Sequence, residues 1–271
     1  MTSAFCCPHC GSALEKADNQ YKCPSNHCFD VSKQGYVNLL VSNKSTSLSG
    51  DDKEMVKART RFLDAGFYAP LRDELCAVLQ QAEYEKGLII DSGCGEGYYT
   101  FGFLHALSEK GVRVSGIDIS KSAIKHAAKR CADAEFAVAS AYHLPYSDEC
   151  ADAVINCFSP AASDEFCRVL RKGGLFIYVV PGAAHLWELK SILYDSPYKN
   201  EEKTESYEGF EFLKAIPVST SFTLEGNDKI LDLFHMTPYT WNTPREGARR
   251  LENIESLFVR AEFFIHIYRK K

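Results

Sequence analysis

Apolar and polar positions change their periodicity repeatedly along the chain from residue 88 onward. Short apolar runs predict buried strands, and apolar positions spaced every three or four residues predict helices between them. The expected strands cover residues 88–91, 112–118, 135–140, 151–156, 175–181, 217–224 and 262–268. The expected helices between them cover residues 98–108, 121–130 and 163–170. Strands that alternate with helices form a doubly wound α/β fold, so we expect a seven-stranded, mostly parallel sheet.

The segments on either side of this pattern are organised differently. Residues 41–52 are rich in Ser and include Asn, Lys and a Gly-Asp step, as is typical of a linker, and helices are expected at 53–63 and 68–81. After the fifth strand, residues 194–211 show little periodicity and residues 235–241 are expected to form a loop, so we interpret about 185–245 as an insertion. The expected organisation is a domain at 1–40, a linker with the start of a connecting helix at 41–60, and a main domain at 61–271.

Composition narrows the class of protein. The chain has 271 residues with 45% hydrophobic and 25% charged content, which suits one α/β core with smaller appendages. Neither a signal segment nor an apolar stretch of membrane-spanning length is present, so we expect no membrane association and a cytoplasmic location. The net charge of -5 gives no general sign of nucleic-acid binding, so any RNA contact must come from local basic positions or from stacking. The N-terminal part offers the better supply of such positions: Lys16, Lys22, Lys33, Lys44, Lys53, Lys57, Arg59 and Arg61.

A glycine turn follows the first buried strand of the main domain. Gly93, Gly95 and Gly97 alternate after Asp91, so the turn can adopt positive φ and let a ligand lie against its backbone. A dinucleotide-binding turn would place the third glycine one residue later. Asp118 ends the second strand, where a carboxylate can accept hydrogen bonds from the ribose hydroxyls of an adenosine ligand. The alternative for Asp118 is a role at the start of the following helix, which Ser120 can cap.

Eleven cysteines without a secretion signal indicate reduced thiols, some of them on a metal. Cys7 and Cys10 are followed, after twelve residues, by Cys23 and a nearby His27-Cys28 pair. Two such turns can close a tetrahedral zinc site, which would stabilise a segment too short to build its own core. Spacing alone leaves the fourth ligand open between His27, Cys28 and a spare thiol at Cys6.

The glycine turn also carries a resemblance to a known class of enzymes. Its spacing, D-x-G-x-G-x-G, resembles motif I of the class I methyltransferases, which bind S-adenosylmethionine on a Rossmann-like fold. Residues 143–148 resemble a loop that contacts the adenine in that class, and the loop after residue 156 is where the methyl acceptor is expected.

A closer resemblance covers nearly the whole chain. The cysteine motif and residues 33–40, 62–68, 93–100, 181–186 and 236–238 are similar to the bacterial large-subunit ribosomal RNA guanine-N1 methyltransferases, which carry an N-terminal zinc domain. The resemblance implies that a homodimer acts on a hairpin of 23S ribosomal RNA. It implies the zinc ligands Cys7, Cys10, Cys23 and His27, and the cofactor contacts Tyr68, Gly95, Glu96 and His185. The sequence departs from the family pattern at Ser92, 171–173 and 156–160.

The reaction implied is direct methyl transfer to guanine N1, with rate acceleration mainly from positioning. The base must leave its stack, and a group must take the N1 proton. The ionisable candidates are Glu96, His143, Asp148 and His185. We expect the zinc domain and residues 187–241 to flank the cofactor pocket and hold the hairpin. Two alternatives remain: a methyltransferase acting on another RNA or on a small molecule, and an RNA-binding protein without activity.

Overall fold

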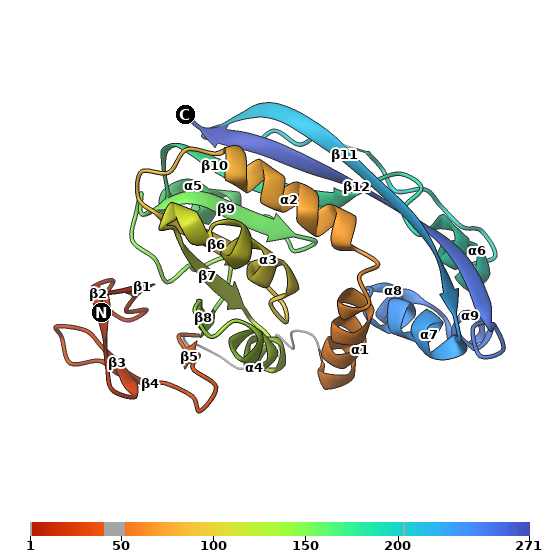
Figure 1. Cartoon of the computed structure of the whole chain (residues 1–271), viewed down its shortest axis with the longest axis horizontal. Helices are drawn as coiled ribbons and strands as arrows, with labels where there is room; N and C mark the ends of the chain where they lie inside the picture. Colours follow the sequence, from red (N-terminus) through yellow and green to blue (C-terminus); the bar gives the residue numbers. More distant parts are fainter. Residues whose placement is uncertain (1, 41–51, 203) are drawn as a thin grey trace.

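The computed structural model describes residues 2–40, 52–202 and 204–271. Its main sheet has the strand order β11-β12-β10-β9-β6-β7-β8-β5 (Figure 1). The strands are β5 Val37–Asn38, β6 Leu88–Ser92, β7 Arg113–Asp118, β8 Glu135–Val138, β9 Ala151–Cys157, β10 Leu170–Pro181, β11 Phe210–Glu225 and β12 Ser256–Lys270. Neighbours from β10 to β5 are parallel, and β12 is antiparallel to both β10 and β11. The predicted mostly parallel sheet is confirmed, and β5 adds a strand to the seven expected ones.

Successive residues of a strand point to opposite faces of the sheet, so each buried strand packs against helices on both sides. Ile89 packs with Leu71, Leu75 and Phe103 of α2 and α3, whereas Ile90 packs with Phe166 of α5. The helices are α1 Lys53–Asp64, α2 Ala69–Gln81, α3 Tyr98–Ala106, α4 Lys121–Arg130, α5 Ser163–Val169, α6 Trp187–Leu193, α7 Asn227–His235, α8 Tyr239–Asn242 and α9 Arg245–Arg249, with a 3-10 turn at Ser108–Lys110. In the described part of the chain, no helix is long and apolar enough to cross a membrane.

The connection between β11 and β12 contains more helix than the sequence analysis predicted. The two strands form a long hairpin that reaches from α2 to α6, and α7, α8 and α9 lie at its far end (Figure 1). The expected loop at 235–241 is therefore partly wrong, because α8 begins at Tyr239. Ile230, Leu233 and Phe234 of α7 are buried with helical spacing, which is the signal that identifies this helix.

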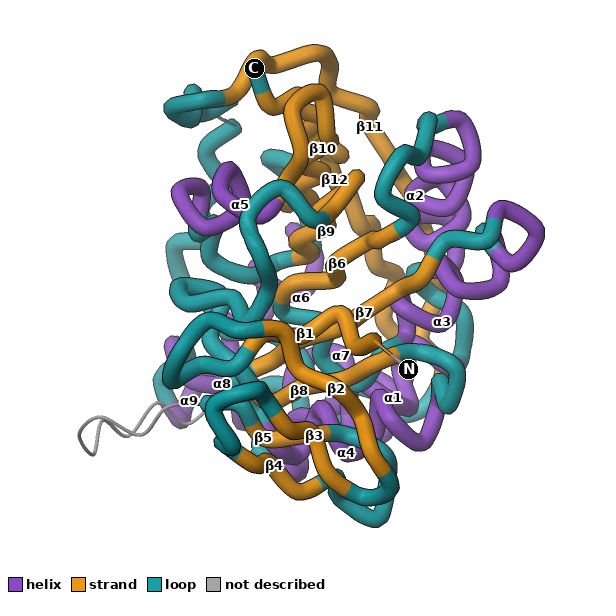
Figure 2. Tube along the Cα trace, turned by 90° about the vertical axis from the view of Figure 1, so that its left-hand side faces the viewer, coloured by secondary structure: helices purple, strands orange, loops and turns teal. Residues whose placement is uncertain are grey.

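The N-terminal residues form a second sheet of four strands that packs on the first. Its strands are β1 Thr2–Cys6, β2 Ala13–Ala17, β3 Gln20–Lys22 and β4 Cys28–Asp30, and Figure 2 shows them beside β8 and β5. Glu135 of β8 accepts hydrogen bonds from the Ser3 hydroxyl (2.7 Å) and the Ala4 N–H (3.1 Å). Phe5 and Tyr21 share a core with the main sheet. We call residues 2–40 the zinc module.

The domain bounds stay a prediction, but the structure shows how closely the parts are joined. The short strand β5 at the end of the zinc module pairs with β8, so the zinc module is continuous with the main sheet. The expected linker at 41–52 lies, apart from Asp52, outside the described residues. Asp52 caps α1 by accepting the Met55 N–H at 2.8 Å.

Candidate active site and metal centre

A cavity of about 690 Å³ opens where the carboxyl ends of β6, β7, β9 and β10 meet. This edge of a doubly wound sheet is where ligands bind, because the loops there diverge. The sequence-predicted site residues that line the cavity are Tyr68, Asp91, Gly93, Gly95, Glu96, Asp118 and His185. Gly97 does not line the cavity; a Cβ there would lie 3.0 Å from Ala127 of α4, so this glycine allows two helices to pack closely.

The glycine turn is held tightly against its surroundings. Gly93, Gly95 and Gly97 have φ of +78°, +57° and +84°, values that favour glycine. The N–H groups of Gly93 and Cys94 both donate to the Ile117 carbonyl of β7, at 2.8 and 3.0 Å. A Cβ on Gly93 would lie 2.7 Å from the Ser159 Oγ, so the turn also touches the loop that follows β9.

Asp118 holds the glycine turn while it faces the cavity. One carboxylate oxygen accepts the Gly95 N–H at 3.0 Å, and the other accepts the Ser120 N–H at 2.7 Å. Ser120 caps α4 by accepting the Ala123 N–H at 3.3 Å. The cap of α4 thus falls to Ser120, while Asp118 fixes the backbone of the glycine turn at the cavity. A carboxylate oxygen that accepts one N–H can still accept another hydrogen bond.

Two further carboxyl groups are buried at the cavity. Asp91 accepts a hydrogen bond from the Thr100 hydroxyl at 2.6 Å, and burial raises the pKa of Asp91 to about 7. Burial also raises the pKa of Glu96, although the nearby Arg59 guanidinium acts in the opposite direction. A cationic ligand would favour the ionised form of both groups.

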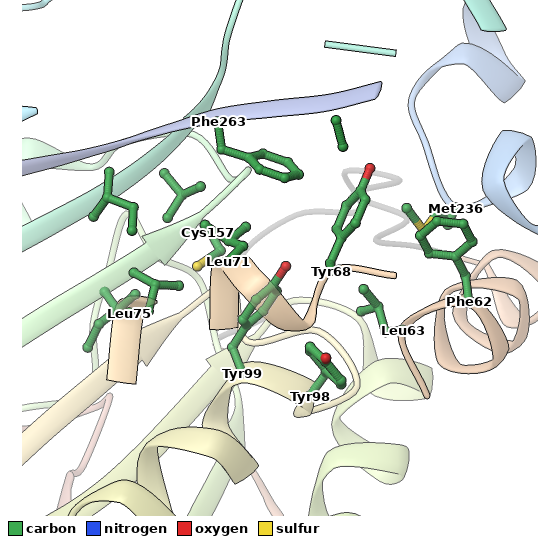
Figure 3. Packing of buried hydrophobic residues seen from close by; sticks show 14 of the residues in the cluster. Phe62, Leu63, Tyr68, Leu71, Leu75, Tyr98, Tyr99, Cys157, Met236 and Phe263 are labelled. Atoms are coloured by element: carbon green, nitrogen blue, oxygen red, sulfur yellow. The ribbon is translucent and has the colours of Figure 1, made fainter. Parts of the chain in front are cut away.

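Three buried polar atoms at the cavity have no hydrogen-bond partner within the described residues. They are the hydroxyl oxygens of Tyr68 and Tyr99 and the Nδ1 of His185. Tyr68 precedes α2 and Tyr99 lies on α3; Figure 3 shows them beside Cys157 and Phe263. Burial lowers the pKa of His185 to about 3, so its imidazole is neutral. Buried polar atoms are almost always paired, so these three fit a polar ligand such as S-adenosylmethionine.

The zinc module brings four potential ligands together. Donor atoms of Cys7, Cys10, Cys23 and His27 all lie within 4.8 Å of one another. The Cys10 and Cys23 sulfurs are 3.7 Å apart, and the His27 Nδ1 lies 3.5 Å from the Cys7 sulfur and 3.3 Å from the Cys23 sulfur. Tetrahedral zinc with ordinary bond lengths requires sulfur–sulfur and sulfur–nitrogen separations of about 3.8 and 3.5 Å. The donor set therefore fits zinc.

Two spare thiols lie outside this group. The Cys28 sulfur is exposed and contacts the Asn26 carbonyl at 3.5 Å, whereas the Cys6 sulfur contacts the Ser147 hydroxyl at 3.1 Å. Of the three candidates left open by spacing at the fourth position, the structure thus brings His27 to the cluster, rather than Cys28 or Cys6.

Some expected residues lie elsewhere, and some unexpected ones line the cavity. His143 and Asp148 are exposed and do not line it; Asp148 pairs with Arg168 at 2.8 Å. In the loop expected at the adenine, Leu144 and Tyr146 instead enter the core shared with the zinc module. Tyr99, Phe158, Asn200 and Thr237 line the cavity without having been predicted as site residues. Tyr99 lies two residues after Gly97, so its closeness to the glycine turn could have indicated a place at the cavity. The other three reach the cavity through tertiary contacts.

The doubly wound sheet, its glycine turn and the cavity at its carboxyl edge define a class I S-adenosylmethionine-dependent methyltransferase with an added zinc module. The family model described as "Methyltransferase domain" matches residues 89–174, and the model described as "RlmA, N-terminal" matches residues 5–47.

Comparison along the whole chain identifies the family. The chain is 32% identical over 259 residues to the 23S rRNA (guanine(748)-N(1))-methyltransferase of Streptomyces fradiae, covering 93% of this chain and 91% of that protein. It is 34% identical over 266 residues to YxjB of Bacillus subtilis, whose name assigns it provisionally to the 23S rRNA (guanine-N1) reaction; this match covers 94% and 93% of the two chains. The chain belongs to the family of 23S rRNA (guanine-N1)-methyltransferases.

Proposed function

We propose that this protein transfers a methyl group from S-adenosylmethionine to N1 of a guanine in a hairpin of 23S ribosomal RNA, in the cytoplasm. The observation that carries this proposal is the similarity to the Streptomyces fradiae enzyme over 93% of the chain, which spans both the zinc module and the cavity. A small-molecule methyltransferase with the same sheet would not need the zinc module.

Each of the cavity residues makes a different contact with the cofactor. Asp118 accepts hydrogen bonds from the ribose hydroxyls, and Gly93 and Gly95 leave room for the ligand against their backbone. Tyr68, Glu96 and His185 supply further polar contacts, and Asp91 faces the cationic part of the ligand. Gly97 supports this site indirectly, by letting α3 pack against α4. When bound, S-adenosylmethionine supplies an electrophilic methyl group.

The residues of the chain position the guanine against the methyl group and supply an acceptor for the N1 proton. Most of the acceleration comes from holding the guanine N1 in line with the methyl group while water is excluded. Of the four ionisable groups considered as proton acceptors, only Glu96 and His185 line the cavity. Burial raises the pKa of Glu96, which makes this carboxylate the stronger base of the two, because the imidazole of His185 has a pKa of about 3.

We also propose that the zinc module grips the RNA and that two chains form a homodimer. The module's Lys16, Lys22 and Lys33 are exposed and can reach phosphates. Arg61 is a weaker candidate than the sequence suggests, because its guanidinium donates to Asp232 at 2.8 Å. Light scattering of the purified protein tests the dimer.

The function is tested by offering three substrate pools with labelled S-adenosylmethionine. Unmodified 23S rRNA made by transcription should be labelled, whereas a nucleotide pool and a metabolite extract should not. Asp118→Ala should reduce the labelling, and Asp148→Asn, in an exposed residue away from the cavity, should not. Label in the extract alone would support a small-molecule enzyme, and RNA binding without label would support a protein without activity.

A further inference from the structure

The loop after β9 holds one aromatic side chain at the cavity in an unusual backbone conformation. Phe158 lines the cavity, is 46% exposed, and has φ of +59°. Bulky side chains rarely adopt this left-handed region, and such a conformation persists only where the surrounding structure enforces it. Backbone outliers of this kind concentrate at functional sites.

Three hydrogen bonds enforce this conformation. The fully buried Asn156 accepts the Ser159 N–H at 3.1 Å and donates its amide to the Pro160 carbonyl at 3.0 Å. The Phe158 N–H donates to the Val179 carbonyl of β10 at 3.3 Å. The Asn156 side chain thus closes the loop around Phe158 and leaves the aromatic ring outside the core.

The position of the loop relates Phe158 to the cofactor-binding turn. Sheet order places β9 on one side of β6 and β7, which ends in Asp118, on the other, so Phe158 faces the end of the cavity remote from the proposed ribose site. Its neighbour Ser159 touches the glycine turn, because a Cβ on Gly93 would lie 2.7 Å from the Ser159 Oγ. The Phe263 ring supports Phe158 at a centroid distance of 5.6 Å.

We propose that Phe158 is the surface on which the target guanine stacks after it leaves the RNA, so that its N1 edge faces the cofactor. This inference rests on the proposed function. An enzyme that modifies a base edge used in pairing must take the base out of its stack, and aromatic side chains hold such bases. The Phe158 ring is planar, nearly half exposed, rigidly placed and close to the glycine turn, so it can hold such a base. A residue that only filled the core would be buried, as Phe263 is.

The test measures methylation of unmodified 23S rRNA by four variants: Phe158→Leu, Phe158→Tyr, Phe158→Trp and Phe158→Gly. Stacking on an aromatic side chain contributes about 1–3 kcal/mol per base, so Phe158→Leu should lower kcat/KM for RNA roughly 5- to 150-fold. Phe158→Tyr and Phe158→Trp should stay within a few-fold of the wild type. Affinity for S-adenosylmethionine, measured by calorimetry, should be unchanged in all of them. Phe258→Leu is the matched control, because Phe258 is 49% exposed on β12 and does not line the cavity.

Phe158→Gly separates a substrate role from a structural one. Glycine relieves the positive φ, so the unfolding temperature should be unchanged or higher while RNA methylation falls as in Phe158→Leu. Wild-type kcat/KM in Phe158→Gly, or a parallel loss of cofactor affinity in Phe158→Leu, would overturn the inference. Absence of RNA methylation by the wild type would instead remove the proposed function, and the inference with it.

Discussion

Gly93→Ala should destabilise the protein through two separable effects. The new Cβ would meet the Oγ and Cβ of Ser159 at 2.7 and 2.8 Å, and φ at this position is +78°. A left-handed backbone costs a non-glycine residue roughly 1–2 kcal/mol. Overpacking costs roughly 1–3 kcal/mol, so the free energy of unfolding should fall by about 2–5 kcal/mol.

A second substitution tells the two effects apart. Ser159→Gly removes the atoms that the new Cβ would meet but leaves the backbone strain at residue 93. The double variant should therefore recover about 1–3 kcal/mol relative to the sum of the single effects, which is a normal coupling energy for residues in contact. Urea unfolding of the four proteins measures this coupling, and calorimetry should show the cofactor affinity falling in Gly93→Ala. Strictly additive effects would refute the close contact between the glycine turn and the loop after β9.

The remaining predictions concern the metal, the cofactor and pH. Cys10→Ser should lower the unfolding temperature of the whole chain in one transition, because the zinc module shares a core with the main sheet; a separate early transition would contradict this. Cys28→Ser should keep full zinc content in elemental analysis, because its sulfur lies outside the cluster. Asp118→Ala should weaken S-adenosylmethionine binding by about 1–3 kcal/mol in calorimetry; an unchanged affinity would contradict the ribose assignment of Asp118. The buried His185 has a pKa of about 3 when folded and 6.5 ordinarily. The unfolded state therefore binds more protons between these values, and the contribution of His185 to stability is lost as pH falls from 6.5 toward 3. Urea unfolding at pH 7 and pH 5 should show a smaller loss in His185→Gln than in the wild type.

Local sequence patterns predicted the main sheet well, because its strands and helices are continuous in sequence. The helix expected at 121–130 has those bounds in the structure, with Ser120 as its cap. The pairing of β5 with β8 could not be predicted, because it joins Val37 to Ala137 across the sequence. Strand β10 begins at Leu170, before the predicted start, because Leu170 pairs with Ala151 of β9 ahead of a register irregularity.

In the candidate site, too, local sequence predicted some residues, whereas others depend on contacts between distant segments. Asp91 and the glycines could be placed because strand, turn and helix follow one another directly. His185 and Tyr68 came only from the family resemblance, since nothing in their local sequence indicates a cavity. The conformation of Phe158 depends on the Asn156 amide and on the Val179 carbonyl of another strand, which no local pattern specifies.

The site of methylation on the RNA tests the central claim most directly. Unmodified 23S rRNA is incubated with the protein and labelled S-adenosylmethionine, digested, and analysed by nucleoside mass spectrometry, with reverse transcription on a second portion. A methyl group on N1 removes the hydrogen-bond donor used in pairing, so we predict labelled 1-methylguanosine and one strong reverse-transcription stop at a guanine in a hairpin. Label on another atom or another nucleoside, or RNA that stays unlabelled, would contradict the account.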